Sequence, residues 1–84
     1  MYRVLTTKSF GKALAKLPVT CHKRILTKIR EIAVDPYAPN NNLAKLQGRA
    51  GYRLRVGDWR IIYELDDEHL AMLVLDMGPR GGIY

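Results

Sequence analysis

The stretch YRLRVGDWRIIYEL, residues 52–65, decides the fold because it predicts a tight β-hairpin with a fixed register. Gly57-Asp58 is a two-residue turn, and side chains alternate between the two faces on either side of it. One face then carries six apolar or aromatic residues, which we expect to form part of the core. They are Tyr52, Leu54, Val56, Trp59, Ile61 and Tyr63. A slip of one residue would bury arginines instead, so the register is strongly specified.

The opposite face of the predicted hairpin carries Arg53, Arg55, Arg60 and Ile62. In this register Arg55 lies directly opposite Arg60, and like charges in that position destabilise a sheet. One interpretation is a solvated face on which Glu64 or Asp76 forms salt bridges with the arginines. The other is an anion site, because a guanidinium donates two parallel hydrogen bonds to a phosphate. The sequence favours the anion site.

The charge of the whole chain points the same way. Its 84 residues include 14 Lys and Arg against 8 Asp and Glu, a formal net charge of +6, and no acid precedes Glu31. A basic field of this kind attracts a polyanion, either nucleic acid or an acidic protein. An excess of charge also keeps a small protein soluble, so the charge alone does not decide between these roles.

Length and composition limit the other possibilities. The length predicts one domain, residues 1–84. No apolar run reaches the length of a membrane span, and the N-terminus lacks the apolar stretch of a signal peptide. The single cysteine, Cys21, excludes an internal disulfide and a cysteine-based zinc site. We therefore expect a cytoplasmic protein without a membrane anchor, a cofactor or a metal.

The rest of the chain predicts an α+β fold. Residues 2–6 alternate as a short strand, and two helices follow, the first capped by Thr7 or Ser9 and the second beginning at Pro18. Residues 36–51 are rich in Pro, Asn and Gly and predict a loop. The last three strands are expected at about 52–56, 59–65 and 69–77. The order β-α-α-β-β-β implies an antiparallel sheet of about four strands, covered on one face by a helical hairpin.

Taken together, these motifs resemble the RelE/ParE superfamily of bacterial toxins from toxin–antitoxin systems. The resemblance rests on Leu46-Gln47-Gly48, the hairpin YRLRVGDWRIIYE and the terminal VLDMGPRGGIY, and it covers the whole chain. It implies a RelE-like fold and a cognate antitoxin, an acidic or amphipathic segment that wraps the toxin. For the RelE branch it also implies metal-independent cleavage of messenger RNA (mRNA) in the ribosomal A site, which makes the ribosome and mRNA partners.

The resemblance also implies which residues carry the chemistry. In that reaction the 2′-hydroxyl attacks the neighbouring phosphate and expels the 5′-oxygen, which requires proton transfer and cations around the phosphorane. The implied catalytic residues are Arg55, Arg60, Arg80 and Tyr84. The residues expected to bind RNA phosphates are Arg53, Lys45 and Arg49.

Two departures from the family pattern bear on activity. Pro79 stands where many relatives have histidine, and proline offers neither an acid nor a base. Arg53 and Arg55 stand where some active members have lysine, and arginine stays protonated, so it is a poor general base. Proton transfer would then fall to Tyr84 or to water. The alternative role for Tyr84 is a terminal aromatic ring packed on the core.

Three functions stay open at this point. A ribosome-dependent mRNA endonuclease is favoured by the basic sheet face. A ParE-like gyrase inhibitor is favoured by the missing histidine and the shortage of bases. A homologue that acts mainly by binding an antitoxin is favoured by Pro79 and Gly81-Gly82. In each case we expect the antitoxin to shield or displace members of one set of residues, which are Arg53, Arg55, Arg60, Arg80 and Tyr84.

Overall fold

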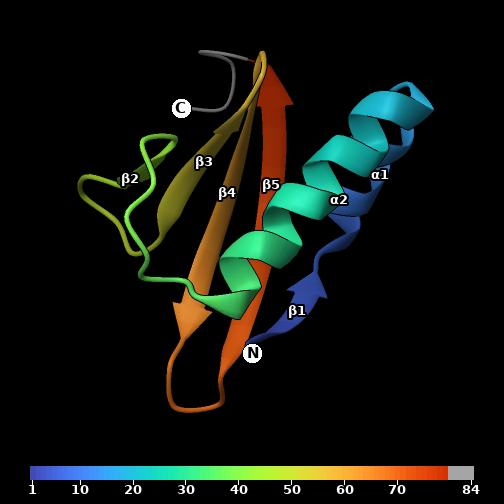
Figure 1. Cartoon of the computed structure of the whole chain (residues 1–84). Helices are drawn as coiled ribbons and strands as arrows, with labels where there is room; N and C mark the ends of the chain where they lie inside the picture. Colours follow the sequence, from blue (N-terminus) through green and yellow to red (C-terminus); the bar gives the residue numbers. More distant parts are fainter. Residues whose placement is uncertain (80–84) are drawn as a thin grey trace.

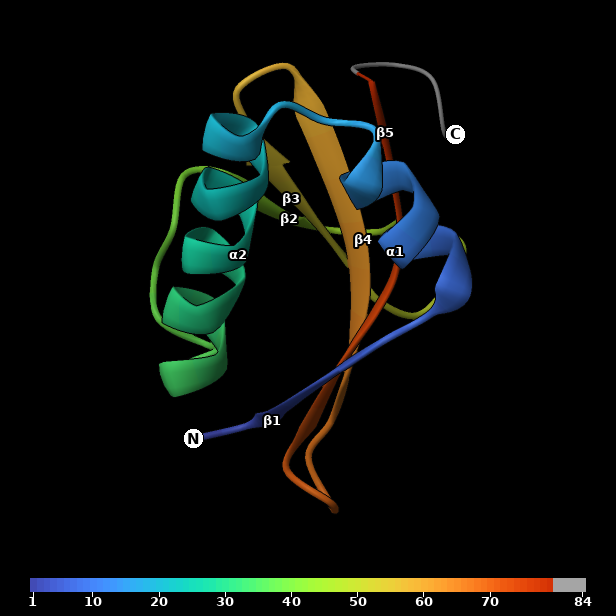
Figure 2. The same ribbon diagram turned by 90° about the vertical axis from the view of Figure 1, so that its right-hand side faces the viewer.

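The computed structural model describes residues 1–79 (Figure 1). In chain order its elements are β1 (Arg3–Thr6), α1 (Lys8–Ala15), α2 (Val19–Val34), β2 (Leu43–Lys45), β3 (Tyr52–Val56), β4 (Trp59–Asp66) and β5 (Ala71–Pro79). The strands form one five-stranded sheet in the order β1-β5-β4-β3-β2. Helix α2 lies across one face of the sheet, and α1 runs beside β5 (Figures 1 and 2). The predicted α+β class is confirmed.

The sheet differs from the expected one in strand number and strand direction. β2 forms within residues 36–51, where the sequence predicts a loop, because it pairs antiparallel with β3 and sets Leu43 opposite Leu54. β1 pairs with β5 in parallel, with Arg3 opposite Ala71, so the sheet is mixed and not wholly antiparallel. A parallel pair requires a long crossover connection, and the chain from α1 to β4 supplies it.

The β3–β4 hairpin has the predicted register, from Tyr52 opposite Tyr63 to Val56 opposite Trp59. Gly57 has a φ of 60°, which suits the first position of a type II′ turn and carries no steric cost for glycine. The rings of Tyr52 and Tyr63 stack with their centroids 5.5 Å apart. The predicted core face is confirmed. Its buried members are Leu54, Val56, Ile61 and Tyr63, and its partly buried members are Tyr52 and Trp59.

The helices begin where the sequence predicts and share one core with the hairpin. Thr7 caps α1, since its Oγ1 accepts a hydrogen bond from the main-chain N of Phe10 at 3.1 Å. Pro18 occupies the N-cap of α2, and Asp35 occupies its C-cap. The helical residues buried in the common core are Phe10, Leu14, Ile25, Ile29, Ile32 and Ala33. Burial of each large aliphatic or aromatic side chain contributes about 1.5–3 kcal/mol.

The turn between β4 and β5, at the far end of β4 from Gly57, is held by carboxylates. The hydroxyls of Tyr2 and Tyr37 both donate to Oδ1 of Asp67, each at 2.7 Å. Asp66 pairs with Nδ1 of His69 at 2.8 Å. The bond to Asp67 raises the pKa of Tyr37 and lowers the pKa of Asp67 itself. These contacts fasten the N-terminus and the segment after α2 to this turn.

Candidate functional site

Three arginines of the hairpin line one hollow, on the sheet face that points away from α2. This arginine hollow has a volume of about 120 Å³, and its walls are Arg53, Arg55, Arg60 and residues 41–44. Arg55 lies opposite Arg60 across the ladder, as predicted, and Arg53 lies two residues back along β3 on the same face. The residues that line the hollow include three arginines and two asparagines, whose guanidinium and amide groups are the kinds of donor that suit an oxyanion.

Strand β2 closes one side of the arginine hollow. The main-chain N of Arg55 donates to the carbonyl of Asn42 at 2.9 Å, and the main-chain N of Asn42 donates to Oδ1 of Asn40 at 2.8 Å. These bonds hold the asparagine stretch beside the arginines. Sequence reasoning missed Asn41 and Asn42 as lining residues. The run of asparagines directly before Leu43 is the signal that could have identified them, because short amides bond to their own backbone and fix a turn.

The structure places the other predicted phosphate-binding residues apart from the arginine hollow. Lys45 pairs with Tyr52 and therefore projects toward the opposite face, the one that α2 covers. Arg49 lines a separate hollow of about 290 Å³ together with Ile62 and Asp76. The predicted residues Arg80 and Tyr84 lie outside the described part of the chain. Within residues 1–79, the structure thus brings together Arg53, Arg55 and Arg60 and leaves Lys45 away from them.

Within the described residues, Glu64 and Asp76, which the interpretation of a salt-bridged face requires, form no ion pair with these arginines. Asp76 accepts hydrogen bonds from Oγ of Ser9 at 3.0 Å and from the main-chain N of Met77 at 2.8 Å, so it anchors α1 to β5. Glu64 takes part in neither of the ion pairs within residues 1–79, which are Lys28–Glu31 and Asp66–His69. The interpretation of a salt-bridged sheet face therefore gains no support from Glu64 or Asp76.

Two further observations concern residues 1–79 as a whole. This part of the chain contains no group of three or more His, Cys, Asp or Glu side chains arranged to hold a metal ion. Neither of its helices has the length and apolar character needed to cross a lipid bilayer.

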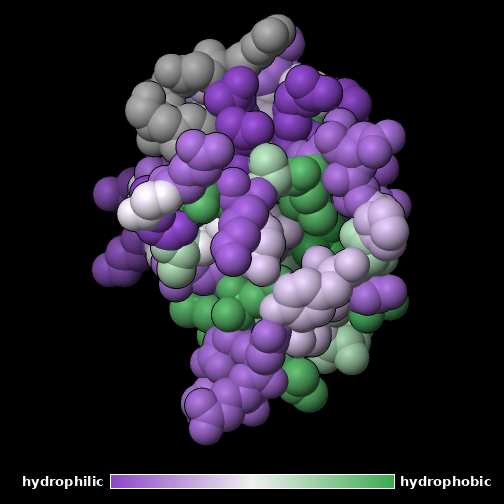
Figure 3. Space-filling view, turned by 90° about the vertical axis from the view of Figure 1, so that its left-hand side faces the viewer, coloured by the Kyte–Doolittle hydropathy of each residue, from purple (hydrophilic) through white to green (hydrophobic). Residues whose placement is uncertain are grey.

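The β2 side of the molecule is strongly hydrophilic over much of its surface, with hydrophobic side chains in a band between the polar regions (Figure 3).

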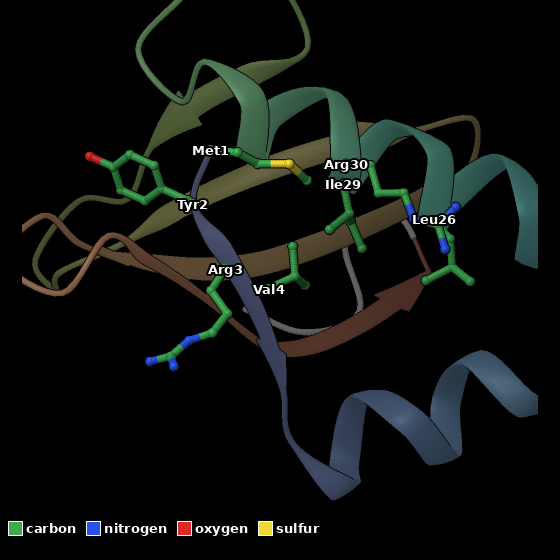
Figure 4. Close-up of a pocket in the computed structure, with 7 residues that line it drawn as sticks. All are labelled: Met1, Tyr2, Arg3, Val4, Leu26, Ile29 and Arg30. Carbon is green, nitrogen blue, oxygen red and sulfur yellow. The ribbon is translucent and has the colours of Figure 1, made fainter.

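A larger hollow lies between β1 and α2, away from the arginine hollow. Its volume is about 470 Å³, and Val4, Leu26 and Ile29 supply apolar side chains that point toward one another there (Figure 4). Arg3 and Arg30 also line it, and the Arg3 side chain extends away from its apolar centre (Figure 4). This hollow suits an apolar side chain of a partner better than it suits chemistry on a charged substrate.

Comparison with known proteins identifies the family. The profile of the ParE toxin of type II toxin–antitoxin systems, parDE, matches residues 4–84. The chain belongs to the RelE/ParE superfamily of toxins. A match over nearly the whole chain confirms the resemblance based on the hairpin and the terminal motif. No protein with a curated description matches this toxin in sequence.

The toxin is similar in structure to chains of several solved toxin–antitoxin complexes. A chain of the archaeal RelE–RelB complex from Pyrococcus horikoshii OT3 has a TM-score of 0.84 and 32% identity, over 96% of this chain and 97% of that chain. A chain of the RelB–RelE antitoxin–toxin complex from Methanococcus jannaschii has a TM-score of 0.74 and 28% identity, over 95% of this chain and 94% of that chain. A chain of the intact E. coli RelBE toxin–antitoxin complex has a TM-score of 0.80 and 23% identity, over 94% of this chain and 96% of that chain. At this identity the similarity supports the fold alone.

Proposed function

We propose that this toxin is a metal-independent endonuclease that cleaves mRNA in the ribosomal A site and so inhibits translation. The observation that carries the proposal is the arginine hollow, in which Arg53, Arg55 and Arg60 line one small space. Arginine recognises phosphate through paired parallel hydrogen bonds, and a hollow lined by several arginines matches a bridging phosphate of RNA. The similarity to a RelE–RelB complex at 32% identity supports the same branch of the superfamily.

The chemistry follows from what arginine does and does not supply. The 2′-oxygen attacks phosphorus, an O2′–P bond forms, and the P–O5′ bond breaks, with negative charge growing on the non-bridging oxygens. Protonated guanidinium groups stabilise that charge, and one well-placed donor of this kind is worth about 100- to 1,000-fold in rate. Because arginine stays protonated, it is a poor acceptor for the 2′-hydroxyl proton. We assign proton transfer to Tyr84 or to water, and charge stabilisation to Arg55 and Arg60.

The proposed partner is a cognate antitoxin with an acidic or amphipathic segment. The solved relatives include archaeal RelE–RelB and RelB–RelE complexes, and the net charge of +6 favours an acidic partner. The apolar hollow between β1 and α2 offers a place for its apolar side chains, and β1 is an edge strand that can accept another strand. Such a segment would place acidic groups near Arg3 and Arg30.

A second candidate function is inhibition of DNA gyrase without RNA cleavage. One specific observation favours it, since the family profile that matches residues 4–84 is that of the ParE toxin. Pro79 at the end of β5, directly opposite Trp59, also supplies no acid or base. This alternative makes the arginine hollow a docking surface for an acidic protein and not a site of chemistry.

The experiment that separates the two functions expresses the toxin and examines both targets. We expect mRNA ends to accumulate at A-site positions of programmed ribosomes while gyrase supercoiling stays unchanged. Arg60→Ala should abolish growth arrest, whereas Arg30→Ala, with the same loss of charge on α2, should retain it. Gyrase-linked DNA breaks with unaltered mRNA ends would refute the endonuclease and establish the second candidate.

A further inference from the structure

A second small hollow lies at the same end of the hairpin as the arginine hollow but on the other side of the sheet. It has a volume of about 140 Å³ and lies between α2 and the β3–β4 turn, where Trp59, Arg24 and Cys21 line it with Gly57-Asp58. We call it the Trp59 hollow. Its hairpin residues Val56 and Trp59 are the direct chain neighbours of arginines that line the arginine hollow. The two hollows therefore occupy opposite faces of one hairpin tip.

Trp59 leaves part of its ring system available in this hollow. It is partly buried and packs against the core on one side, although its position on the apolar face predicts a core residue. Within residues 1–79 the one aromatic stacking or cation–π contact is Tyr52–Tyr63, so no ring or cation of this region stacks on the indole. An indole that is only partly buried is typical of a recognition surface, where it offers a large rigid face to a partner.

The guanidinium of Arg24 lies beside the β3–β4 turn. A Cβ atom added to Gly57 would lie 3.4 Å from Nη1 of Arg24, so the guanidinium packs closely over the position where glycine has no side chain. Asp58, next in the turn, adds a carboxylate to the lining. Aromatic rings and guanidinium planes are the groups on which unpaired RNA bases stack, and carboxylates accept hydrogen bonds from base amino groups.

We propose that the Trp59 hollow is a nucleobase subsite. A base of single-stranded RNA stacks on Trp59 beside Arg24, while phosphate of the same strand lies in the arginine hollow on the other face. The turn is then an edge over which the strand bends, which separates neighbouring bases and exposes their faces. This inference rests on the proposed function, since it takes RNA as the ligand. An acidic peptide would match the charge of Arg24 but would present no base to the indole.

Two residues whose types occur once in the chain make the subsite directly observable. Trp59 is the single tryptophan and Cys21 the single cysteine of the chain, and both line this hollow. The full-length toxin is titrated with a short oligoadenylate whose 2′-hydroxyls are methylated, so that it cannot be cleaved. An oligonucleotide of equal length without bases is the matched ligand. Anisotropy of a dye on the RNA end measures binding, tryptophan fluorescence measures stacking, and the rate of alkylation by iodoacetamide measures access to Cys21.

We expect both oligonucleotides to bind, because both carry the phosphates. Only the oligoadenylate should quench Trp59 and slow the alkylation of Cys21, and it should bind about tenfold more tightly because of base stacking. Arg24→Ala should lower this preference for the base-bearing ligand about threefold. Lys23→Ala removes one positive charge from an exposed position of the same helix outside the hollow and should leave the preference unchanged. Trp59→Leu should abolish the preference, and Trp59→Phe, which keeps an aromatic face, should retain most of it.

Several results would overturn the subsite. Equal affinity for the two oligonucleotides, without quenching or protection of Cys21, would refute it and leave the proposed endonuclease intact, since the arginine hollow would still bind phosphate. Quenching and protection by polyglutamate as strong as those by oligoadenylate would assign the hollow to an acidic protein. Failure of both oligonucleotides to bind would refute it as well. Loss of A-site cleavage is measured separately on ribosomes, so the two proposals fail independently.

Discussion

The two faces of the β3–β4 hairpin alternate along the same strands but contribute in different ways. On the face toward α2, Leu54 is 2% exposed and Ile61 is fully buried, and both belong to the core cluster that includes Ile25 and Ile29 of α2. On the face that points away from α2, Arg55 is exposed and shares a hollow with Arg60. The first face specifies the fold through burial, whereas the second places like charges opposite each other, which costs stability. The fold fixes the position of the arginine face although this face lowers stability. Binding of an anionic ligand explains such a face best.

The largest expected effect on stability is on the core face. Leu54→Ala should lower the free energy of unfolding by about 3 kcal/mol, because it removes buried methyl groups and leaves a cavity. Arg55→Ala, the next residue along β3, should change it by less than about 0.5 kcal/mol. Urea denaturation at equilibrium measures both values. If the two substitutions proved equally destabilising, the claim that the core face and not the arginine face stabilises the fold would be wrong.

A smaller effect is expected at the glycine that joins the loop of Arg49 to β3. Gly51 has a φ of 113°, and an added Cβ would lie 2.8 Å from the carbonyl oxygen of Tyr63. Gly51→Ala should therefore cost about 2 kcal/mol, since both the backbone conformation and β4 resist it. Gly48→Ala, at a φ of 74° in open space, is the matched control and should cost about 1 kcal/mol. A thermal melt that ranks Gly48→Ala as the worse change would contradict the close approach of the Gly51 backbone to β4.

Removal of one polar group from the core face, the hydroxyl of Tyr63, should have a small stabilising effect. This hydroxyl is buried and has no hydrogen-bond partner within residues 1–79, and burial raises the pKa of Tyr63. Tyr63→Phe keeps the ring stacked on Tyr52 and removes the unsatisfied hydroxyl, so it should raise the free energy of unfolding by about 1 kcal/mol. Tyr52→Phe is the comparison on the partner ring. A loss of stability in Tyr63→Phe alone would mean that the hydroxyl has a partner.

The smallest expected effect concerns pH at the turn between β4 and β5. Hydrogen bonds from Tyr37 and then Tyr2 hold the pKa of Asp67 below its ordinary 3.8. A carboxyl with a lowered pKa in the folded state stabilises the protein above that ordinary value, and the contribution is lost as pH falls through the folded pKa. Asp67→Asn should therefore flatten the acid limb of the stability curve. Asp67→Asn should leave the arginine hollow unchanged, so RNA binding near neutral pH should stay at the wild-type level.

Much of the fold was predictable because it depends on local periodicity and turn chemistry. Alternation around Gly57-Asp58 predicts the register of β3 and β4 and, with it, which side chains share the arginine hollow. The caps at Thr7 and Pro18 are likewise local signals. These features need no knowledge of distant parts of the chain.

The remaining features depend on contacts between distant segments. The three residues of β2 show no alternation long enough to predict a strand and become one by pairing with β3. The parallel pairing of β1 with β5 is a property of the whole topology. Lys45 was expected to bind RNA phosphate, and its register with Tyr52 places it on the other face of the sheet from the hairpin arginines. The Trp59 hollow requires α2 to pack over the hairpin turn, which no sequence pattern shows.

The central claim is that the arginine face carries activity and not stability. The most direct test is the rate of mRNA cleavage on programmed ribosomes by Arg55→Ala, beside Arg30→Ala and the wild-type toxin, under conditions where all three are folded. We predict that Arg55→Ala cleaves about 100-fold more slowly and that Arg30→Ala stays within about threefold of wild type. Cleavage by folded Arg55→Ala at the wild-type rate would contradict the claim.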